Sequence, residues 1–286
     1  MKRKHGILSK FKEDRLALAG LGIVFGILLV AVFAPFLAPY PQDLYQIHLS
    51  ERLQEPTLLH LFGTDDMGRD LLRRVIFGTR VSFTIAILSV GICLLIGVPI
   101  GLYAGFYENG FSSVLMRIGD IFLSVHRLVL ALAFASALGR SMTNIILALS
   151  ITYWPWFSTL VFAETRKAKK SLFIESTMAL GASSPRTIFL HILPNVLSPI
   201  IIRSSVGLGF TILMTASLGF IGVGVPPPTP EWGITIAESR LHLPEAWWYA
   251  TFPGLAIFIT VMGFNMLGDG LRDILDPRLR RGGKEE

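Results

Sequence analysis

The sequence predicts an all-α, polytopic membrane protein with six transmembrane helices. Of its 286 residues, 52% are hydrophobic, and the mean hydropathy of +0.58 lies above that of soluble domains. Apolar segments recur that are long enough, at about 20 residues, to cross a hydrocarbon core of roughly 30 Å as helices. We expect these spans at residues 16–38, 81–107, 128–138 with an earlier start in 118–125, 142–163, 195–225 and 247–267.

The N-terminal segment could be a cleaved signal peptide or a retained transmembrane helix. Residues 1–15 are basic and polar, and no charged residue occurs from Leu16 to Ala38. This run is longer than the core of a signal peptide, and prolines follow it in place of a clear cleavage site. We therefore expect a retained first helix, with a cleaved signal peptide as the alternative.

The segment between the fourth and fifth spans, residues 175–194, is too polar to lie in lipid. Apolar side chains recur at helical spacing around its start, which predicts a short helix with one apolar stripe. Gly181 is expected to end that helix, because a left-handed residue is wanted at this position. The stripe consists of Leu172, Phe173, Ile174, Thr177, Met178 and Leu180.

A second short helix is expected directly after this turn. Ser184 is predicted to cap it, with Pro185 as its first residue, where the missing N–H does no harm. Pro194 is expected to stop or kink it where the fifth span begins. The two helices would form an elbow within residues 164–194, whose apolar side chains point away from the chain's own spans toward a partner's groove. A surface loop without a partner is the alternative.

The distribution of lysine and arginine predicts the orientation. Six spans place both termini on one side, which carries 18 Lys and Arg residues against 7 on the other. The excess marks the cytoplasmic side, so the elbow and both termini are expected there. The chain then divides into 1–80 (basic segment, first helix and extracytoplasmic segment), 81–276 (core transmembrane domain with the elbow) and 277–286 (cytoplasmic tail).

The extracytoplasmic segment ends in a predicted short amphipathic helix. A turn and a cap at Thr64 or Asp65 precede apolar residues at helical spacing from Leu71 onward, and Gly78 is expected to close the helix. By itself this pattern indicates an interfacial helix whose arginines meet lipid headgroups and local carboxylates. The arginines are Arg69, Arg73, Arg74 and Arg80.

Small residues and a proline shape two of the spans. Gly97, Gly101 and Gly105 lie on one stripe of the second span, where small residues let helices approach closely in lipid. We expect a helix-packing face there, not a ligand site. Pro155 predicts a kink in the fourth span.

Three basic side chains lie at or inside the spans. Arg203 falls well inside the fifth span, where a charge exposed to lipid costs several kcal/mol. It should face a protein interface or a water-filled cavity, or snorkel back to the cytoplasmic headgroups. His126 and Arg127 could snorkel to an interface or line a path.

The sequence contains no recognisable nucleotide-binding or hydrolase signature, such as G-x-x-x-x-G-K-[ST] or H-E-x-x-H. The six histidines are scattered without metal-ligand spacing, and Cys93 is a lone cysteine in an apolar run. The basic residues cluster on one membrane side, which does not favour nucleic acid. We therefore expect no enzyme, no metal site and no cofactor in this chain; energy from ATP would have to come from a partner.

Three stretches carry a family resemblance. Glu175 and Gly181, followed by the Ile-Leu-Pro that ends at Pro194, resemble the cytoplasmic E-A-A-x-x-x-G signature of ABC importer permeases, although Ser176 and Thr177 replace its two alanines. Residues 63–70, GTDDMGRD, resemble the G-T-D-x-x-G-R-D segment of the dipeptide, oligopeptide and nickel permeases. Residues 268–278 resemble the G-D-x-L-R-D-x-L-D-P-R ending of the same family, whose C-type member this chain is similar to along nearly its whole length.

The resemblance implies a type I importer permease in the cell membrane. Its partners would be a second, homologous permease in a heterodimer, two ATP-binding subunits that hold ATP and magnesium, an extracytoplasmic substrate-binding protein and membrane lipid. The cargo would be peptides, with nickel or other small solutes as the alternative. The residues expected to couple to the ATPases are Glu175, Met178, Ala179, Gly181, Ala182 and Pro194. Arg203, Met214 and Asn265 are expected, from polarity and position, along the translocation path.

Two other classes of function make different demands on the sequence. A stand-alone secondary transporter predicts acidic residues inside the spans or inverted repeats. An intramembrane enzyme needs paired catalytic groups at membrane depth. Neither pattern occurs, since no Asp or Glu lies well inside a span.

Overall fold

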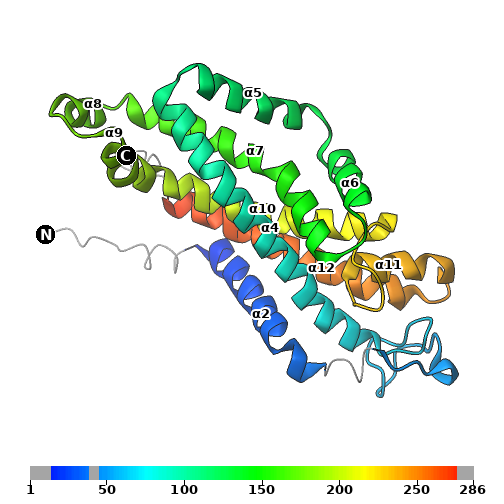
Figure 1. Cartoon of the computed structure of the whole chain (residues 1–286). Helices are drawn as coiled ribbons and strands as arrows, with labels where there is room; N and C mark the ends of the chain where they lie inside the picture. The colour runs from blue at the N-terminus through cyan, green and yellow to red at the C-terminus, as the bar shows by residue number, and fades with distance from the viewer. Residues whose placement is uncertain (1–13, 39–44, 276–286) are drawn as a thin grey trace, which may run out of the picture.

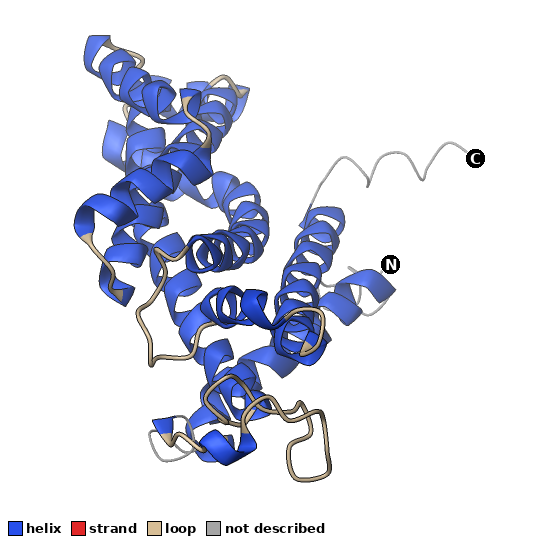
Figure 2. Cartoon of the chain, turned by 90° about the vertical axis from the view of Figure 1, so that its right-hand side faces the viewer, coloured by secondary structure: helices blue, strands red, loops and turns tan. Residues whose placement is uncertain are grey.

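The computed structural model describes residues 14–38 and 45–275, and in these ranges the chain is helical without a β-strand (Figure 2). Five helices are long and apolar enough to cross a membrane, and a bent helix pair forms a sixth candidate span. The prediction of an all-α protein with six spans is confirmed. The α-helices are α2 (Arg15–Leu37), α4 (Leu71–Tyr107), α5 (Gly110–Ser124), α6 (Arg127–Leu138), α7 (Met142–Lys169), α8 (Leu172–Ala179), α9 (Ser184–Arg186), α10 (Leu193–Ile221), α11 (Trp232–Ser239) and α12 (Trp247–Leu275).

Shorter helical turns complete the chain, and the long helices run side by side (Figure 1). The turns are η1 (Leu49–Glu51), the π-helix η2 (Thr187–Ile192) and η3 (Arg240–His242). Helix α4 packs on α7 and α10, and α12 packs on α2 and α10. Helices α8 and α9 lie at one end of the bundle, whereas α11 and the loop before α4 lie at the other. Residues 1–13 of the basic N-terminal segment and the tail at 277–286 lie outside the described residues.

Helix α4 is longer than the sequence predicted. Its 37 residues form one helix from the outer segment into the second span, so the expected end at Gly78 is wrong. Gly78 is needed for packing instead, because a Cβ there would lie 2.9 Å from the Trp232 ring of α11. The boundary drawn at residues 80 and 81 therefore falls inside a continuous helix.

The glycine stripe of α4 is a helix-packing face, as predicted. A Cβ on any of the three glycines would come within 2.7 Å of a backbone carbonyl oxygen of α7. Such contacts are closer than real Cβ atoms allow, so only glycine permits this separation of the two backbones. The glycines 97, 101 and 105 meet the carbonyl oxygens of Trp154, Ser158 and Phe162 respectively.

The third candidate span is a bent pair of helices. Its first part is helix α5, whose N-cap Asn109 accepts a hydrogen bond from Ser112 N at 2.8 Å. Helices α5 and α6 together are long and apolar enough to cross a membrane, but they are bent by 95° relative to each other. The earlier start expected for this span is confirmed, and the sharp bend at Val125 and His126 was not predicted.

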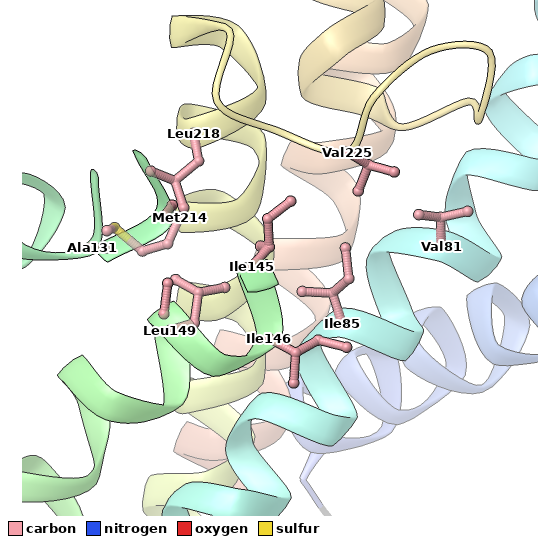
Figure 3. Close-up of a cluster of buried hydrophobic side chains, with 11 residues drawn as sticks. Val81, Ile85, Ala131, Ile145, Ile146, Leu149, Met214, Leu218 and Val225 are labelled. Carbon is pink, nitrogen blue, oxygen red and sulfur yellow. The ribbon is translucent and has the colours of Figure 1, made fainter. Parts of the chain in front are cut away.

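A buried hydrophobic cluster joins four of the long elements (Figure 3). Side chains from α4, α6, α7 and α10 interdigitate there, and Val225 closes the cluster after α10. Burial of these side chains fixes the positions from which α6 and α10 present their polar residues. The cluster consists of Val81, Ile85, Ala131, Ala135, Ile145, Ile146, Ala148, Leu149, Met214, Leu218 and Val225.

Candidate functional site

The elbow begins with helix α8 and the turn that follows it. Gly181 adopts φ +86°, the left-handed conformation that the sequence predicted. Its N–H donates to Met178 O at 3.0 Å, and Ala182 N donates to Thr177 O at 3.3 Å. These bonds satisfy the last carbonyls of α8, so the chain reverses without leaving backbone acceptors open.

The second half of the elbow differs from the prediction. Ser183, one residue before the expected Ser184, stands at the cap position, and neither serine side chain makes a capping hydrogen bond. Pro194 does not stop the helix, because Ser184–Ile221 forms one helical run of 38 residues. The turns before Pro194 are π-helical, so carbonyls there pair with amides five residues on and the missing Pro194 N–H does not interrupt the run.

One face of the elbow packs against the chain itself. Ile174, Ile188 and Ile192 are buried in a cluster with side chains of α4 and α7, and Met178 packs partly against the same cluster. The expectation that the whole apolar stripe points away from the chain's own spans is therefore wrong for Ile174. This inner face anchors the elbow to the transmembrane bundle, so a force on the elbow reaches α4 and α7.

The other face of the elbow is apolar and exposed. Its five large side chains have between 61% and 88% of their surface accessible. Of the predicted coupling residues, Glu175, Ala179, Gly181 and Pro194 are exposed, and Met178 and Ala182 are half-buried. We call the five large exposed apolar side chains the elbow surface; they are Leu172, Phe173, Leu180, Phe189 and Leu190.

Ion pairs fix the base of the elbow to the end of α4. Glu108, in a left-handed conformation after α4, lies 2.9 Å from Arg166 Nε and 3.4 Å from Lys169 Nζ. Lys169 Nζ also donates to Phe106 O at 2.6 Å. The basic residues before the elbow therefore hold α7 against α4, which sets the direction in which the elbow projects.

The opposite end of the molecule holds a buried ionic network. Asp65 accepts hydrogen bonds from Arg69 Nε at 2.6 Å and Arg74 Nη1 at 2.9 Å. Arg74 Nη2 donates to Glu238 of α11 at 2.9 Å, and Tyr249 Oη lies 3.1 Å from the same carboxylate. The side chains of Asp65, Arg69 and Arg74 are at most 3% exposed. The expected pairing of these two arginines with a local carboxylate is confirmed, but both are buried inside the fold, so the expectation that they also meet headgroups is wrong.

A second buried carboxylate caps α11 at this end. Glu231 is 1% exposed, and its Oε2 accepts a hydrogen bond from Ile234 N at 3.0 Å. Its Oε1 has no hydrogen-bond partner among the described residues. Burial disfavours the charged form and raises the pKa of Glu231 to about 7, against the lowering effect of its backbone hydrogen bonds.

The three predicted path residues occupy different surroundings. Arg203 stacks on Trp156 of α7, with its Cζ 3.0 Å from the ring centroid. Of the three locations expected for Arg203, a protein interface, a water-filled cavity or the headgroups, the contact with Trp156 agrees with a protein interface. Met214 is 6% exposed inside the hydrophobic cluster (Figure 3), and Asn265 is exposed on α12. No hydrogen bond or ring contact joins these three described side chains.

One grouping was missed from the sequence. Arg127, at the start of α6, lies over the rings of Tyr153, Trp156 and Phe210, so it shares Trp156 with Arg203. The contact depends on the 95° bend between α5 and α6, which directs the start of α6 toward α7 and α10. The sequence could have indicated it only if this bend had been predicted.

Two family models match the chain. Residues 97–281 match the family "Binding-protein-dependent transport system inner membrane component". Residues 5–56 match the "N-terminal TM domain of oligopeptide transport permease C". The second match covers α2 and the segment that leads toward the ionic network.

Similar proteins match over almost the whole chain. The dipeptide transport system permease protein DppC of Alkalihalophilus pseudofirmus is 40% identical, covering 95% of this chain and 88% of that protein. The probable D,D-dipeptide transport system permease protein DdpC of Escherichia coli is 39% identical, covering 96% and 91%. The glutathione transport system permease protein GsiD of Pectobacterium atrosepticum is 39% identical, covering 95% and 90%.

A solved structure shares the fold. The MetNI methionine ABC transporter in an inward-facing conformation aligns with a TM-score of 0.59 and 16% identity, over 72% of this chain and 98% of the matched chain. At this identity the likeness concerns the fold alone. The matching family models and the curated relatives together show that this chain belongs to the family of binding-protein-dependent transport system inner membrane components and carries the N-terminal domain of oligopeptide transport permease C.

Proposed function

We propose that this chain is the C-type permease subunit of an ABC importer that moves peptides across the cell membrane after a binding protein delivers them. The observation that carries the proposal is the elbow surface. Its five large apolar side chains lie on and next to α8 and α9 and are at least 61% exposed. Surfaces that face water rarely leave such an apolar patch uncovered. In this family, a groove on an ATP-binding subunit would cover it.

The elbow is built to pass a displacement into the membrane. Gly181 separates α8 from the 38-residue run Ser184–Ile221, which continues without a break through the span. Closure of two ATP-binding subunits, which hold ATP and magnesium, would draw the elbows of this chain and a homologous permease together. Because Ile188 and Ile192 are buried against α4 and α7, the spans would move with the elbow. The predicted coupling residues transmit force and perform no chemistry.

The orientation follows from the same arrangement. The elbow must face the cytoplasm, where ATP is, so both termini lie there too. The arginines of the extracytoplasmic segment count against this orientation in the positive-inside rule. Two of them count less, because Arg69 and Arg74 are buried with Asp65 and Glu238. The ionic network then faces the compartment that holds the substrate-binding protein. Peptides are the favoured cargo because the relatives are named for dipeptide and glutathione transport.

Transport by the complete complex tests this function. We would reconstitute the chain with the second permease, both ATP-binding subunits and the binding protein in liposomes, and follow uptake of a dipeptide mixture by mass spectrometry. We expect uptake only with ATP and the binding protein together. Uptake driven by a proton or sodium gradient without ATP would contradict the proposal and favour a secondary transporter.

A further inference from the structure

Two arginines and three aromatic rings form one cluster between α6, α7 and α10. The Arg127 Cζ lies 4.5 Å from the Tyr153 ring centroid, 4.8 Å from that of Trp156 and 4.6 Å from that of Phe210. The Arg203 Cζ lies 3.0 Å from the Trp156 centroid. One indole is therefore shared by two guanidinium groups.

No carboxylate among the described residues forms an ion pair with the positive charges of this cluster. The ion pairs between described residues lie at the two ends of the molecule, in and near the buried ionic network and at the base of the elbow. Two polar atoms at the cluster are buried without a hydrogen-bond partner, Arg203 Nε and Tyr153 Oη. Buried donors are normally satisfied, so the cluster is incomplete: it presents unused donors and two unbalanced positive charges.

The cluster lies among the membrane-spanning helices. Arg203 falls in the fifth expected span, residues 195–225, and Trp156 in the fourth, residues 142–163. Arg127, Arg203 and Trp156 are each only partly buried within the chain. A guanidinium that faces lipid inside a span costs several kcal/mol. The cluster must therefore face a protein subunit or a water-filled pathway.

The backbone at the cluster also favours an anion. Arg127 is the first residue of α6, and the N-cap His126 makes no side-chain capping bond. The start of a helix carries partial positive charge, and broken spans whose helix starts point at anionic substrate groups are a recurring feature of transporter sites at mid-membrane. The bend at Val125 and His126, at 95°, places this helix start at the two guanidinium groups.

We propose that Arg127 and Arg203 form a binding site for the carboxylate of the translocated solute, with Tyr153 Oη as a third donor. The inference rests on the proposed function and deepens it by assigning the residues that meet the cargo. Planar guanidinium groups bind carboxylates through paired N–H donors. In the empty site the aromatic rings hold the guanidinium groups; a carboxylate entering the pathway takes their place as the partner. The site is weak enough to release cargo, because the rings compete for the same cations.

Transport of a free acid and its amide tests the site. We would reconstitute the complete complex with Arg203→Gln or Arg127→Gln, and measure uptake of alanyl-alanine and alanyl-alanine amide per ATP hydrolysed, at saturating binding protein. We expect uptake of the free acid to fall about tenfold, the loss of one charge-assisted hydrogen bond, and uptake of the amide to change less than about twofold. Arg203→Lys should recover part of the loss.

A matched control separates this site from a general cation–ring contact. Arg240 also lies over a ring, 4.9 Å from the Phe220 centroid, but it is exposed at the outer end. Arg240→Gln should leave the ratio of acid to amide uptake at the wild-type value.

Three outcomes would overturn the proposal. Equal losses for acid and amide would make the arginines spacers between helices, and unchanged uptake of both would leave them without a role in transport. Failure of the Arg203→Gln permease to assemble with its homologous partner would assign the missing carboxylate to that subunit. Failure of the proposed function looks different, since the wild-type complex would then import neither compound with ATP.

Discussion

The two ends of this molecule are both marked by sequence motifs, yet they are built in opposite ways. At the outer end, the buried side chains of Asp65, Arg69 and Arg74 form ion pairs with one another and with Glu238. At the other end, the elbow surface leaves Leu180 88% exposed and Leu172 81% exposed. The outer motif completes its interactions within the chain, whereas the elbow leaves its apolar face open.

This difference separates residues that stabilise the fold from residues that need a partner. A buried carboxylate with two arginines is costly to disrupt, because removing one charge strands the others away from water. An exposed leucine contributes little to folding, because it is equally exposed in the unfolded chain. Substitutions at the outer end should therefore lower stability, and those on the elbow surface should lower coupling.

The largest effect is expected at the centre of the ionic network. Asp65→Asn removes the charge between Arg69 and Arg74, so the free energy of unfolding should fall by about 3–5 kcal/mol. Asp66→Asn is the matched control, because that side chain is 26% exposed and screened by solvent. Thermal unfolding of the purified protein in detergent measures both. Equal melting temperatures for the two variants would mean that the network does not support the outer end.

The carboxyl of Glu231 makes the same end sensitive to pH. Because its pKa rises from an ordinary 4.5 to about 7 on folding, the folded state binds more protons than the unfolded state between these values. Stability should be greatest below pH 4.5 for this group and fall by about 3 kcal/mol as pH rises to 7. Glu231→Gln should remove this slope in melts recorded from pH 5 to 8, and a slope that persists would assign it to another group.

A smaller effect is expected between the two ends, on the glycine stripe. Gly101→Ala would place a Cβ 2.6 Å from Ser158 O, so we expect a loss of about 1–3 kcal/mol from overpacking α4 against α7. The same substitution at Gly91 meets nothing within 4 Å and should be neutral or stabilise by up to about 1 kcal/mol. Comparing the two melting temperatures tests whether close backbone approach, and not helix propensity, explains the stripe.

The smallest change in stability is expected on the elbow surface. Leu180→Ser should alter the free energy of unfolding by less than about 0.5 kcal/mol, yet weaken binding of the ATP-binding subunits, measured by co-purification. Leu241, 89% exposed at the opposite end, provides the control: Leu241→Ser should leave both quantities unchanged. A large loss of stability in Leu180→Ser would show that Leu180 stabilises the fold of this chain and is not free to bind a partner.

Features that depend on local sequence could be predicted. The positions of the spans follow from apolar runs, the left-handed Gly181 from a helix that must end, and the packing role of the glycines at 97, 101 and 105 from their spacing. The coupling role of the elbow residues stays a prediction that the fold does not test.

Features that depend on distant contacts could not be predicted. Arg74 meets Glu238 across 164 residues of sequence, and nothing near Arg74 indicates that partner. In the sequence Gly78 is consistent with a helix end, and only the structure shows that Trp232 packs on it. Ile174 belongs to the same stripe as Leu172, but the cluster beneath the elbow decides which of them is buried. The meeting of Arg127 and Arg203 likewise requires the bend in the third span.

One crosslinking experiment tests the central claim, that the open end of the molecule binds an ATP-binding subunit in the cytoplasm. A Leu180→Cys variant that also carries Cys93→Ser has one thiol, on the elbow surface. In membranes that contain the complete complex, we expect this thiol to crosslink to an ATP-binding subunit, with a yield that changes on adding nucleotide. Labelling of the thiol by a membrane-impermeant reagent in intact cells, without any crosslink, would place the elbow outside and contradict the account.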